Sequence, residues 1–196
     1  FEGGSAAYNM PGSIYLNQSV DIESFRRAFE VTIERPESLR TVFREDESGE
    51  IRQWILELSD IGFSIDYRDF RDVPNGRAEA DSYISTDSYR AFDLERGPLL
   101  RAALLQVGEG EYVFYFNMHH IISDGWSMEV LSSDVLKFYD GFKLGIEPDL
   151  PELRIQYRDY SVWQLGQLNE ESFNIHKSYW LDRLGGELPL LDLPTS

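Results

Sequence analysis

The sequence predicts an α/β fold in which helices and strands pack in layers. The run from Tyr112 to Phe116 is apolar at every position and consists of aromatic and β-branched residues, as in a central strand covered on both faces. Apolar residues then recur at helical spacing, at Met128, Leu131, Val135, Phe138, Tyr139 and Phe142. Strand-like and helical runs also precede this segment, so a sheet packed by helices is expected.

The first elements are a strand and an amphipathic helix. Residues 14–16 indicate an edge strand or a short strand. Asp21 is a good N-cap for the helix that follows. One face of this helix carries Ile22, Phe25, Phe29 and Ile33. Pro36 ends the helix, because proline has no amide hydrogen to continue the hydrogen-bonding pattern.

Strand signals return after the first helix. Residues 39–44 and 51–58 are strand-like and flank the turn signal Ser48-Gly49, and a further extended run covers residues 63–67. We expect these runs to form a hairpin with an extra strand. The polar stretch 78–89 has the composition of a surface helix.

A second hairpin leads to the most informative segment of the chain. Residues 99–107 and 112–118 are strand-like and flank Gly108-Glu109-Gly110. The return strand delivers His119 and His120 to the turn before the next helix, so its register fixes where they lie. Turns between the carboxyl end of a strand and the amino end of a helix often hold ligands or catalytic groups.

The last third of the chain is expected to be helical. Helices are predicted to about residue 144, over residues 155–168 and over residues 171–184. Tyr160 and Trp163 are at helical spacing and are expected to pack in the core. Gly185-Gly186 closes the last helix, and the proline content of residues 188–194 is typical of a crossing linker.

The two adjacent histidines are expected to have different surroundings. Successive side chains on an extended backbone point to opposite faces, so one of His119 and His120 should face a cavity and the other the interior. A neutral imidazole, with a reference pKa of about 6.5, can act as a general base. Asp124 can orient an imidazole or pair with an arginine, and Gly125 leaves room for a substrate near the backbone. The amides of residues 126–128, if they open the helix, can receive an oxyanion.

Other interpretations of the histidines stay open. A histidine at such a place can be a hydrogen-bonded structural residue, and we prefer this interpretation for His119. A zinc site is disfavoured, because the adjacent pair and Asp124 lack the i, i+4 spacing of a two-histidine helical site. His176 is the one further imidazole, and the chain has no cysteine.

Four segments resemble one protein family. Residues 119–125 read HHIISDG, which resembles the HHxxxDG motif of condensation domains of nonribosomal peptide synthetases. Three more segments, in the family's order, resemble its RHExLRTxF, FDLxxGPLLR and YxDYAVW motifs: residues 35–43 (RPESLRTVF), 92–101 (FDLERGPLLR) and 157–163 (YRDYSVW). The chain is therefore identified as a member of this family. Pro36 departs from the family's histidine at that position.

The resemblance implies a chloramphenicol-acetyltransferase-like lobe with a mixed β-sheet packed by helices. A condensation domain has two such lobes, with the active site in the cleft between them. The chain resembles the amino-terminal lobe over residues 1–187. Residues 188–196 would begin the linker to the carboxyl-terminal lobe, which the chain lacks.

The resemblance also implies an activity, which is peptide-bond formation. The amino group of a downstream aminoacyl thioester attacks an upstream acyl or peptidyl thioester, and phosphopantetheine tethers both to carrier proteins. No cofactor is expected to bind the lobe itself. The implied partners are the upstream and downstream carrier proteins, the carboxyl-terminal lobe and an adjacent adenylation domain.

The family assigns roles to the residues around the turn. His120 takes the catalytic position, either as the base toward the amine or as a hydrogen-bonding group that orients it. His119 makes an inward hydrogen bond. Asp124 forms a structural salt bridge with Arg40 that ties the loop to the neighbouring strand, as in the family.

The rest of the loop is expected to support the substrate. Gly125 matches the family position beside the substrate channel, where a methyl group would obstruct the thioester. Trp126 and Ser127 complete the ISDGWS form seen in domains that join two residues of L configuration.

The bulk composition limits the classes of function that the chain can have. A chain of 196 residues with 42% hydrophobic content can bury a sizeable core and is expected to form one compact unit. The net charge of −17 opposes binding to nucleic acid or to an anionic membrane. The absence of cysteine excludes a disulfide framework, and the lack of a signal peptide or long apolar span favours a cytoplasmic protein.

Two alternatives to peptide-bond formation by this chain remain. The first is a coenzyme-A-dependent acyltransferase of the same superfamily, which shares only the shorter HxxxD signature; the three further segments favour the synthetase. The second is a non-catalytic lobe, because a cleft that needs two walls cannot hold its reactants with one. Apolar surface left uncovered in such a lobe would favour self-association.

Overall fold

The computed structural model describes residues 6–168 and 173–187. The chain divides into two compact units, Phe1–Arg154 and Ile155–Ser196, and each is described by itself. The lobe boundary expected at residue 187 stays a prediction. The linker expected at residues 188–196 lies outside the described residues.

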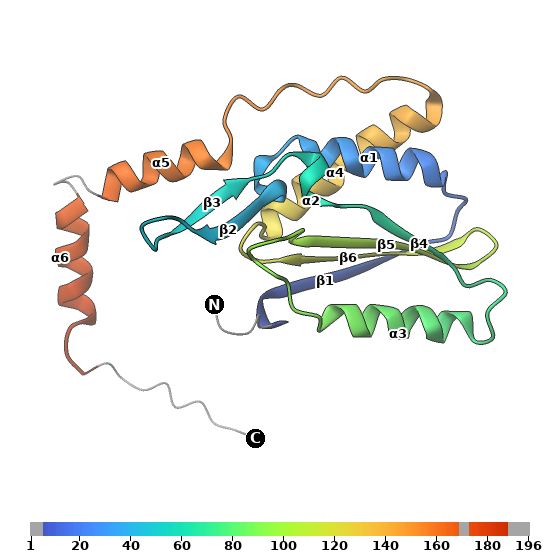
Figure 1. The fold of residues 1–196 in the computed structure, drawn as a ribbon, viewed down its shortest axis with the longest axis horizontal. Coiled ribbons are helices and arrows are strands. Elements are labelled where there is room, and N and C mark those ends of the chain that lie inside the picture. Colours follow the sequence, from blue (N-terminus) through green and yellow to red (C-terminus); the bar gives the residue numbers. More distant parts are fainter. Residues whose placement is uncertain (1–5, 169–172, 188–196) are drawn as a thin grey trace. The chain divides into compact units, whose positions relative to one another are not determined.

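A four-stranded mixed sheet forms the centre of the first unit (Figure 1). Its strands, in spatial order, are β1 (Asn9–Leu16), β6 (Glu111–His119), β5 (Leu100–Gly108) and β4 (Ile65–Asp69). The hairpin of β5 and β6 is antiparallel, as its turn signal predicted, and β1 pairs antiparallel with the outer side of β6. The short strand predicted around residue 15 is therefore a full edge strand.

The predicted hairpin is confirmed, but the extra strand does not join it. Strands β2 (Thr41–Glu45) and β3 (Ile51–Ile55) form the predicted hairpin, but they stand as a separate two-stranded sheet. Strand β4 instead lies parallel to β5 in the main sheet. The short helix α2 (Leu58–Ile61) separates β3 from β4, and it ends at Gly62, whose positive φ of 64° redirects the chain.

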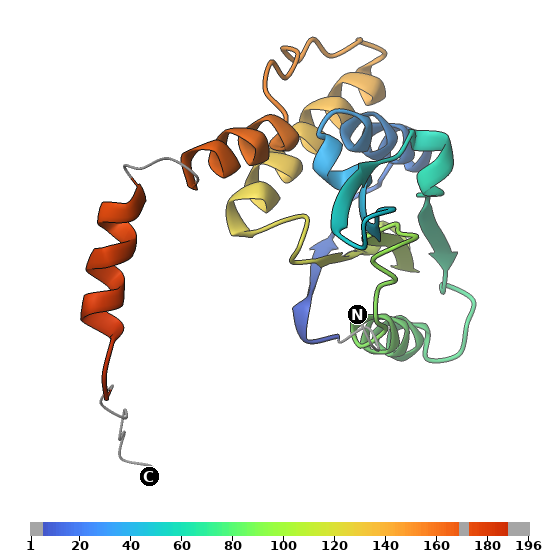
Figure 2. The same cartoon turned by 60° about the vertical axis from the view of Figure 1, so that its left-hand side comes forward.

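Helices cover both faces of the main sheet (Figures 1 and 2). The helices α1 (Ile22–Glu34) and α4 (Gly125–Leu144) lie together on one face, and α3 (Gly76–Ser88) lies on the other. The predicted N-cap of α1 is confirmed, because the carboxylate of Asp21 accepts a hydrogen bond from the amide of Ser24 at 2.7 Å. The amide of Asp21 in turn donates to the hydroxyl of Tyr139 on α4, at 3.1 Å, which fixes one helix against the other.

The larger hydrophobic core lies between the sheet and the pair α1 and α4. The rings of Phe25, Phe29 and Phe114 meet there with centroids 5.2 Å apart. Alternation along β6 explains the arrangement, because Phe114 and Met118 point into this core while Val113 and Tyr115 point into a smaller core on the α3 side. The same alternation continues through His119, the last residue of β6, to His120.

The second unit contains two helices whose side chains are exposed. They are α5 (Tyr157–Leu168) and α6 (Phe173–Leu184), and none of their described residues is buried. Tyr160 is 42% exposed and Trp163 is 59% exposed, so the second unit does not bury them by itself, and their packing in a core stays a prediction. Their rings contact each other along α5, with centroids 5.6 Å apart, since three residues make nearly one helical turn.

No helix in the described parts of the chain is long and apolar enough to cross a membrane.

Candidate active site

The end of β6 and the turn into α4 hold the two adjacent histidines. The amide of His119 donates to the carbonyl of Leu99, before β5, at 3.0 Å, and the amide of His120 donates to the carbonyl of Tyr8, before β1, at 2.9 Å. The amide of Ile122 donates to the carbonyl of His119 at 3.1 Å and closes the turn. Backbone bonds to both neighbouring strands therefore hold the pair in place.

The side chain of His119 lies inside the protein. The residue is 8% exposed, and its ring lies near those of Tyr8 and Phe92, with centroids 5.9 and 6.1 Å away. Its Nδ1 accepts a hydrogen bond from the amide of Ile121 at 3.1 Å. Burial, followed by the nearby charge of His120, lowers the pKa of His119. The ring is therefore held neutral, with its proton on Nε2.

The side chain of His120 is exposed to solvent. The two imidazoles thus have opposite surroundings, as the alternation of side chains along a strand predicts. His120 sits where a reactant could approach the turn, with its backbone fixed at Tyr8 and its neighbour fixed in the interior. An imidazole in this position can accept a proton or donate a hydrogen bond.

Asp124 is the N-cap of α4. Its carboxylate accepts hydrogen bonds from the amide and the hydroxyl of Ser127, at 2.8 and 2.6 Å. These bonds lower the pKa of Asp124, and the nearby charge of His120 lowers it further. Asp124 therefore stays ionised and anchors the start of the helix beside His120.

Arg40 and Asp124, which were expected to form a salt bridge, have other partners in the structure. Arg40 lies at the end of η2 (Glu37–Arg40), and its guanidinium donates to the carbonyl of Leu56 and, at 3.2 Å, to that of Glu34. Among the residues that the structure describes, no ion pair joins it to Asp124, whose carboxylate accepts from Ser127. Each group has another partner nearby. Arg40 donates hydrogen bonds to carbonyl groups at the end of α1 and after β3, while Asp124 accepts hydrogen bonds at the start of α4.

The expectation that the first amides of α4 are available to an oxyanion was wrong for two of the three. The amide of Ser127 donates to the Asp124 carboxylate, and the amide of Met128 donates to the Asp124 carbonyl at 3.1 Å. The amide of Trp126 also contributes to lowering the pKa of Asp124. The amides that were expected to face a substrate therefore donate hydrogen bonds to Asp124 at the start of the helix.

Gly125 and Trp126 border open space. A methyl group added at Gly125 would meet no protein atom within 4 Å, and Trp126 is 76% exposed. The structure therefore leaves the space beside Gly125 free for another molecule.

Sequence reasoning gave no role to the two residues whose rings contact His119. Phe92 lies in the FDL segment of the family resemblance, and Tyr8 lies in η1 (Ala6–Tyr8) just before β1. The family motif was the available signal for Phe92. The contact of Tyr8 with His119 depends on the pairing of β1 with β6, which local sequence does not specify.

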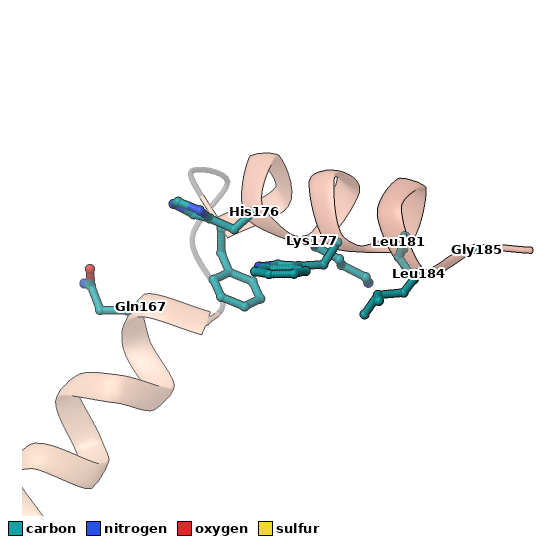
Figure 3. A pocket seen from close by; sticks show the side chains of 8 residues that line it. Gln167, His176, Lys177, Leu181, Leu184 and Gly185 are labelled. Atoms are coloured by element: carbon teal, nitrogen blue, oxygen red, sulfur yellow. The ribbon is translucent and has the colours of Figure 1, made fainter. Parts of the chain in front are cut away.

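Two cavities formed by described residues lie away from the histidine pair. An apolar cavity of about 320 Å³ lies between the sheet and the helices α1 and α4, and its lining includes Phe116 and Leu131 but neither histidine of the pair. A groove of about 760 Å³ in the second unit is lined by His176 and by apolar residues of α6 such as Leu181 (Figure 3). In the described residues, no group of three or more His, Cys, Asp and Glu side chains could hold a metal ion. We take the turn at His120 as the candidate site because its exposed imidazole can accept a proton or donate a hydrogen bond.

The chain belongs to the condensation-domain family. The family model of the condensation domain matches residues 1–196, as the four sequence segments predicted. A linear gramicidin synthase of Brevibacillus parabrevis is 41% identical over 193 residues, which make up 97% of this chain and 2% of that protein. Malpibaldin synthetase of Mortierella alpina is 34% identical over 194 residues, 99% of this chain and 4% of that protein. The chain thus spans a small part of each of these relatives.

Solved structures confirm the predicted fold. The starter condensation domain of rhizomide synthetase RzmA superimposes with a TM-score of 0.83 at 21% identity, over 93% of this chain and 43% of that one. The SgcC5 protein of Streptomyces globisporus gives a TM-score of 0.74 at 26% identity, over 93% of this chain and 40% of that one. The mixed sheet packed by helices is therefore the fold of part of a condensation domain.

Proposed function

We propose that this chain provides the histidine-bearing wall of a condensation site that forms a peptide bond between two thioesters. Membership of the condensation-domain family and the relatives that are named as synthases and synthetases support the reaction class. The observation that carries the proposal is the exposed imidazole of His120 at a turn whose other imidazole is buried and neutral.

His120 acts on the attacking amine. Its ring either takes a proton from the amine or orients it by a hydrogen bond while the tetrahedral intermediate forms. A general base of this kind contributes about 10²- to 10⁴-fold to a rate. Positioning of two tethered reactants contributes separately, because holding them together replaces an encounter in solution.

The reactants arrive on partner proteins. Phosphopantetheine arms of an upstream and a downstream carrier protein bring the acyl and aminoacyl thioesters to His120, and the open space beside Gly125 accommodates the thioester. The chain itself contributes side chains and backbone to the site and no bound cofactor. A carboxyl-terminal lobe supplies the opposite wall, and an adenylation domain loads the carrier.

The test is a condensation assay with defined donors. This chain, joined to the carboxyl-terminal lobe of a condensation domain, is offered an aminoacyl carrier protein together with the same acyl group on a carrier protein or on coenzyme A. Dipeptide formation from the carrier-bound donor supports the proposal. Faster reaction with the coenzyme A donor and a free acceptor would instead assign the chain to coenzyme-A-dependent acyltransferases.

The same assay compares the chain joined to a carboxyl-terminal lobe with the chain alone. The chain without the added lobe is expected to form no dipeptide, because one wall cannot hold both thioesters. Full activity of the chain alone would contradict a site shared between two lobes.

A further inference from the structure

A buried polar cluster lies on the α3 side of the sheet, close to His119. At its centre is Asp87, which is in the last turn of α3 and is 6% exposed. The Asp87 carboxylate forms an ion pair with Arg101 of β5 at 2.8 Å and accepts a hydrogen bond from the hydroxyl of Tyr115 of β6 at 2.9 Å. Arg90 forms a second ion pair with it at 2.9 Å. One carboxylate thereby joins a helix end to two central strands.

The backbone at this helix end binds the same strands. The carbonyl of Asp87 accepts a hydrogen bond from the side-chain amide of Asn117 at 3.1 Å, and Asn117 lies two residues before His119 on β6. The side-chain amide of Asn9 donates to the carbonyl of Ser88 at 2.8 Å, and Asn9 is the residue of β1 that pairs with His119. The helix end therefore binds residues next to His119 on two strands.

A second path leads from Asp87 to the His119 ring itself. The guanidinium of Arg101 lies 3.8 Å from the centroid of the Phe92 ring, within the range of a cation–π contact. The Phe92 ring then meets the His119 ring in an edge-to-face arrangement, with centroids 6.1 Å apart. Because the Arg101 and Asp87 side chains are 15% and 8% exposed, loss of the carboxylate would leave a largely buried guanidinium without its charge partner.

We propose that Asp87 is a positioning residue, which acts through Arg101 and Phe92 to hold the His119 ring and the turn that exposes His120. The catalytic consequence rests on the function proposed above, whereas the effect on His119 does not. Phe92 excludes water from one side of the His119 ring, and the Asp87–Arg101 pair holds Phe92 in place. The ring of His119 can then keep Nδ1 free of a proton to accept from the amide of Ile121.

A second pair of aspartate and arginine on the same face of the sheet provides a control. Arg68 of β4 donates to the carboxylate of Asp66 at 2.8 Å, and its guanidinium lies 4.4 Å from the centroid of the Tyr83 ring. The Asp66–Arg68 pair lies at the β4 edge, separated from β6 by β5, and is more exposed than the Asp87–Arg101 pair. Tyr83 lies on α3 and its ring also contacts that of Tyr115 on β6, so Tyr83 is left unchanged. Substitution of this pair shows whether any change on this face of the sheet alters the His119 ring.

The decisive experiment follows the His119 imidazole in the full chain by nitrogen NMR. In the wild-type protein at pH 7, His119 is expected to carry its proton on Nε2 alone. Phe92→Leu and Asp87→Asn should mix the two tautomers and raise the His119 pKa toward about 6.5, the value in water. Asp66→Asn should change neither property. Unchanged His119 signals in folded Asp87→Asn or in Phe92→Leu, or an equal change in Asp66→Asn, would overturn the proposal.

Activity provides a second measurement, in the chain joined to a carboxyl-terminal lobe. Phe92→Leu is expected to lower kcat at least about fivefold with little change in KM, because the reactants still bind while His120 is less well placed. Phe92→Leu is the primary variant because it leaves the Asp87–Arg101 pair intact and so spares the fold if Asp87→Asn does not. If the wild type forms no dipeptide, the proposed function fails, and the His119 signals still decide the positioning role.

Discussion

His119 and His120 are neighbours in the chain, yet their imidazoles lie in opposite surroundings. His119 is 8% exposed and accepts a hydrogen bond from the amide of Ile121, whereas His120 is exposed to solvent at the end of β6. One histidine therefore stabilises the turn, and the other is available to a reactant. This division leads to separate predictions for the two residues.

His120→Ala is expected to lower dipeptide formation about 10²- to 10⁴-fold if the imidazole acts as a base. The melting temperature should change little, because substitutions of exposed side chains usually have small effects on stability. Dipeptide yield and thermal unfolding measure the two quantities. His176→Ala, which removes another exposed imidazole, is the control and should retain activity. Equal loss of stability and activity in His120→Ala would argue against a direct role.

His119 should make stability depend on pH below about 6.5, the pKa of an imidazole in the unfolded chain. Its pKa is lowered in the folded state by burial, so the unfolded state, with a pKa of about 6.5, binds more protons in this window. The contribution to the free energy of unfolding is thus complete above about pH 6.5 and is lost as the pH falls toward the folded pKa. Urea unfolding of the wild type and of His119→Asn at several pH values measures it. Parallel pH profiles for the two proteins would contradict the prediction, and His176→Asn provides the control.

Asp124→Ala should cost about 0.5 to 2 kcal/mol of stability, the usual cost of losing an N-cap. Asp124→Ser, which keeps a capping oxygen, should recover most of it. Because Arg40 and Asp124 have separate partners, the effects of Arg40→Ala and Asp124→Ala should add to within about 0.5 kcal/mol in the double variant. Chemical denaturation measures each value. A clear coupling energy between the two would restore the salt bridge that the structure does not contain.

Gly125→Ala should lower condensation without lowering stability. The added methyl group meets no protein atom within 4 Å, and alanine favours a helix over glycine by up to about 1 kcal/mol. Stability should therefore be equal or slightly higher, while condensation falls if a thioester passes beside this residue. Melting temperature and KM for the aminoacyl carrier are the measurements. Unchanged kinetics would place the substrate path elsewhere, and Gly166→Ala, also in open space within a helix, is the matched control.

Local patterns in the sequence determined several parts of the structure. Asp21 caps α1 as predicted, the glycine turn joins β5 to β6, and the alternation of side chains separates His119 from His120. These features depend on residues close together in the chain, so composition and spacing suffice to predict them. The four family segments likewise identified the family.

Only the tertiary structure decided which distant groups meet. Strand β4 pairs with β5 across more than 30 residues, Asp124 caps its own helix instead of binding Arg40, and Asp87 of α3 pairs with Arg101 of β5. Each outcome is a choice among competing partners for a strand edge, a carboxylate or a buried charge. Such choices depend on which groups the folded chain brings within about 3 Å of one another, and local sequence does not encode that distance.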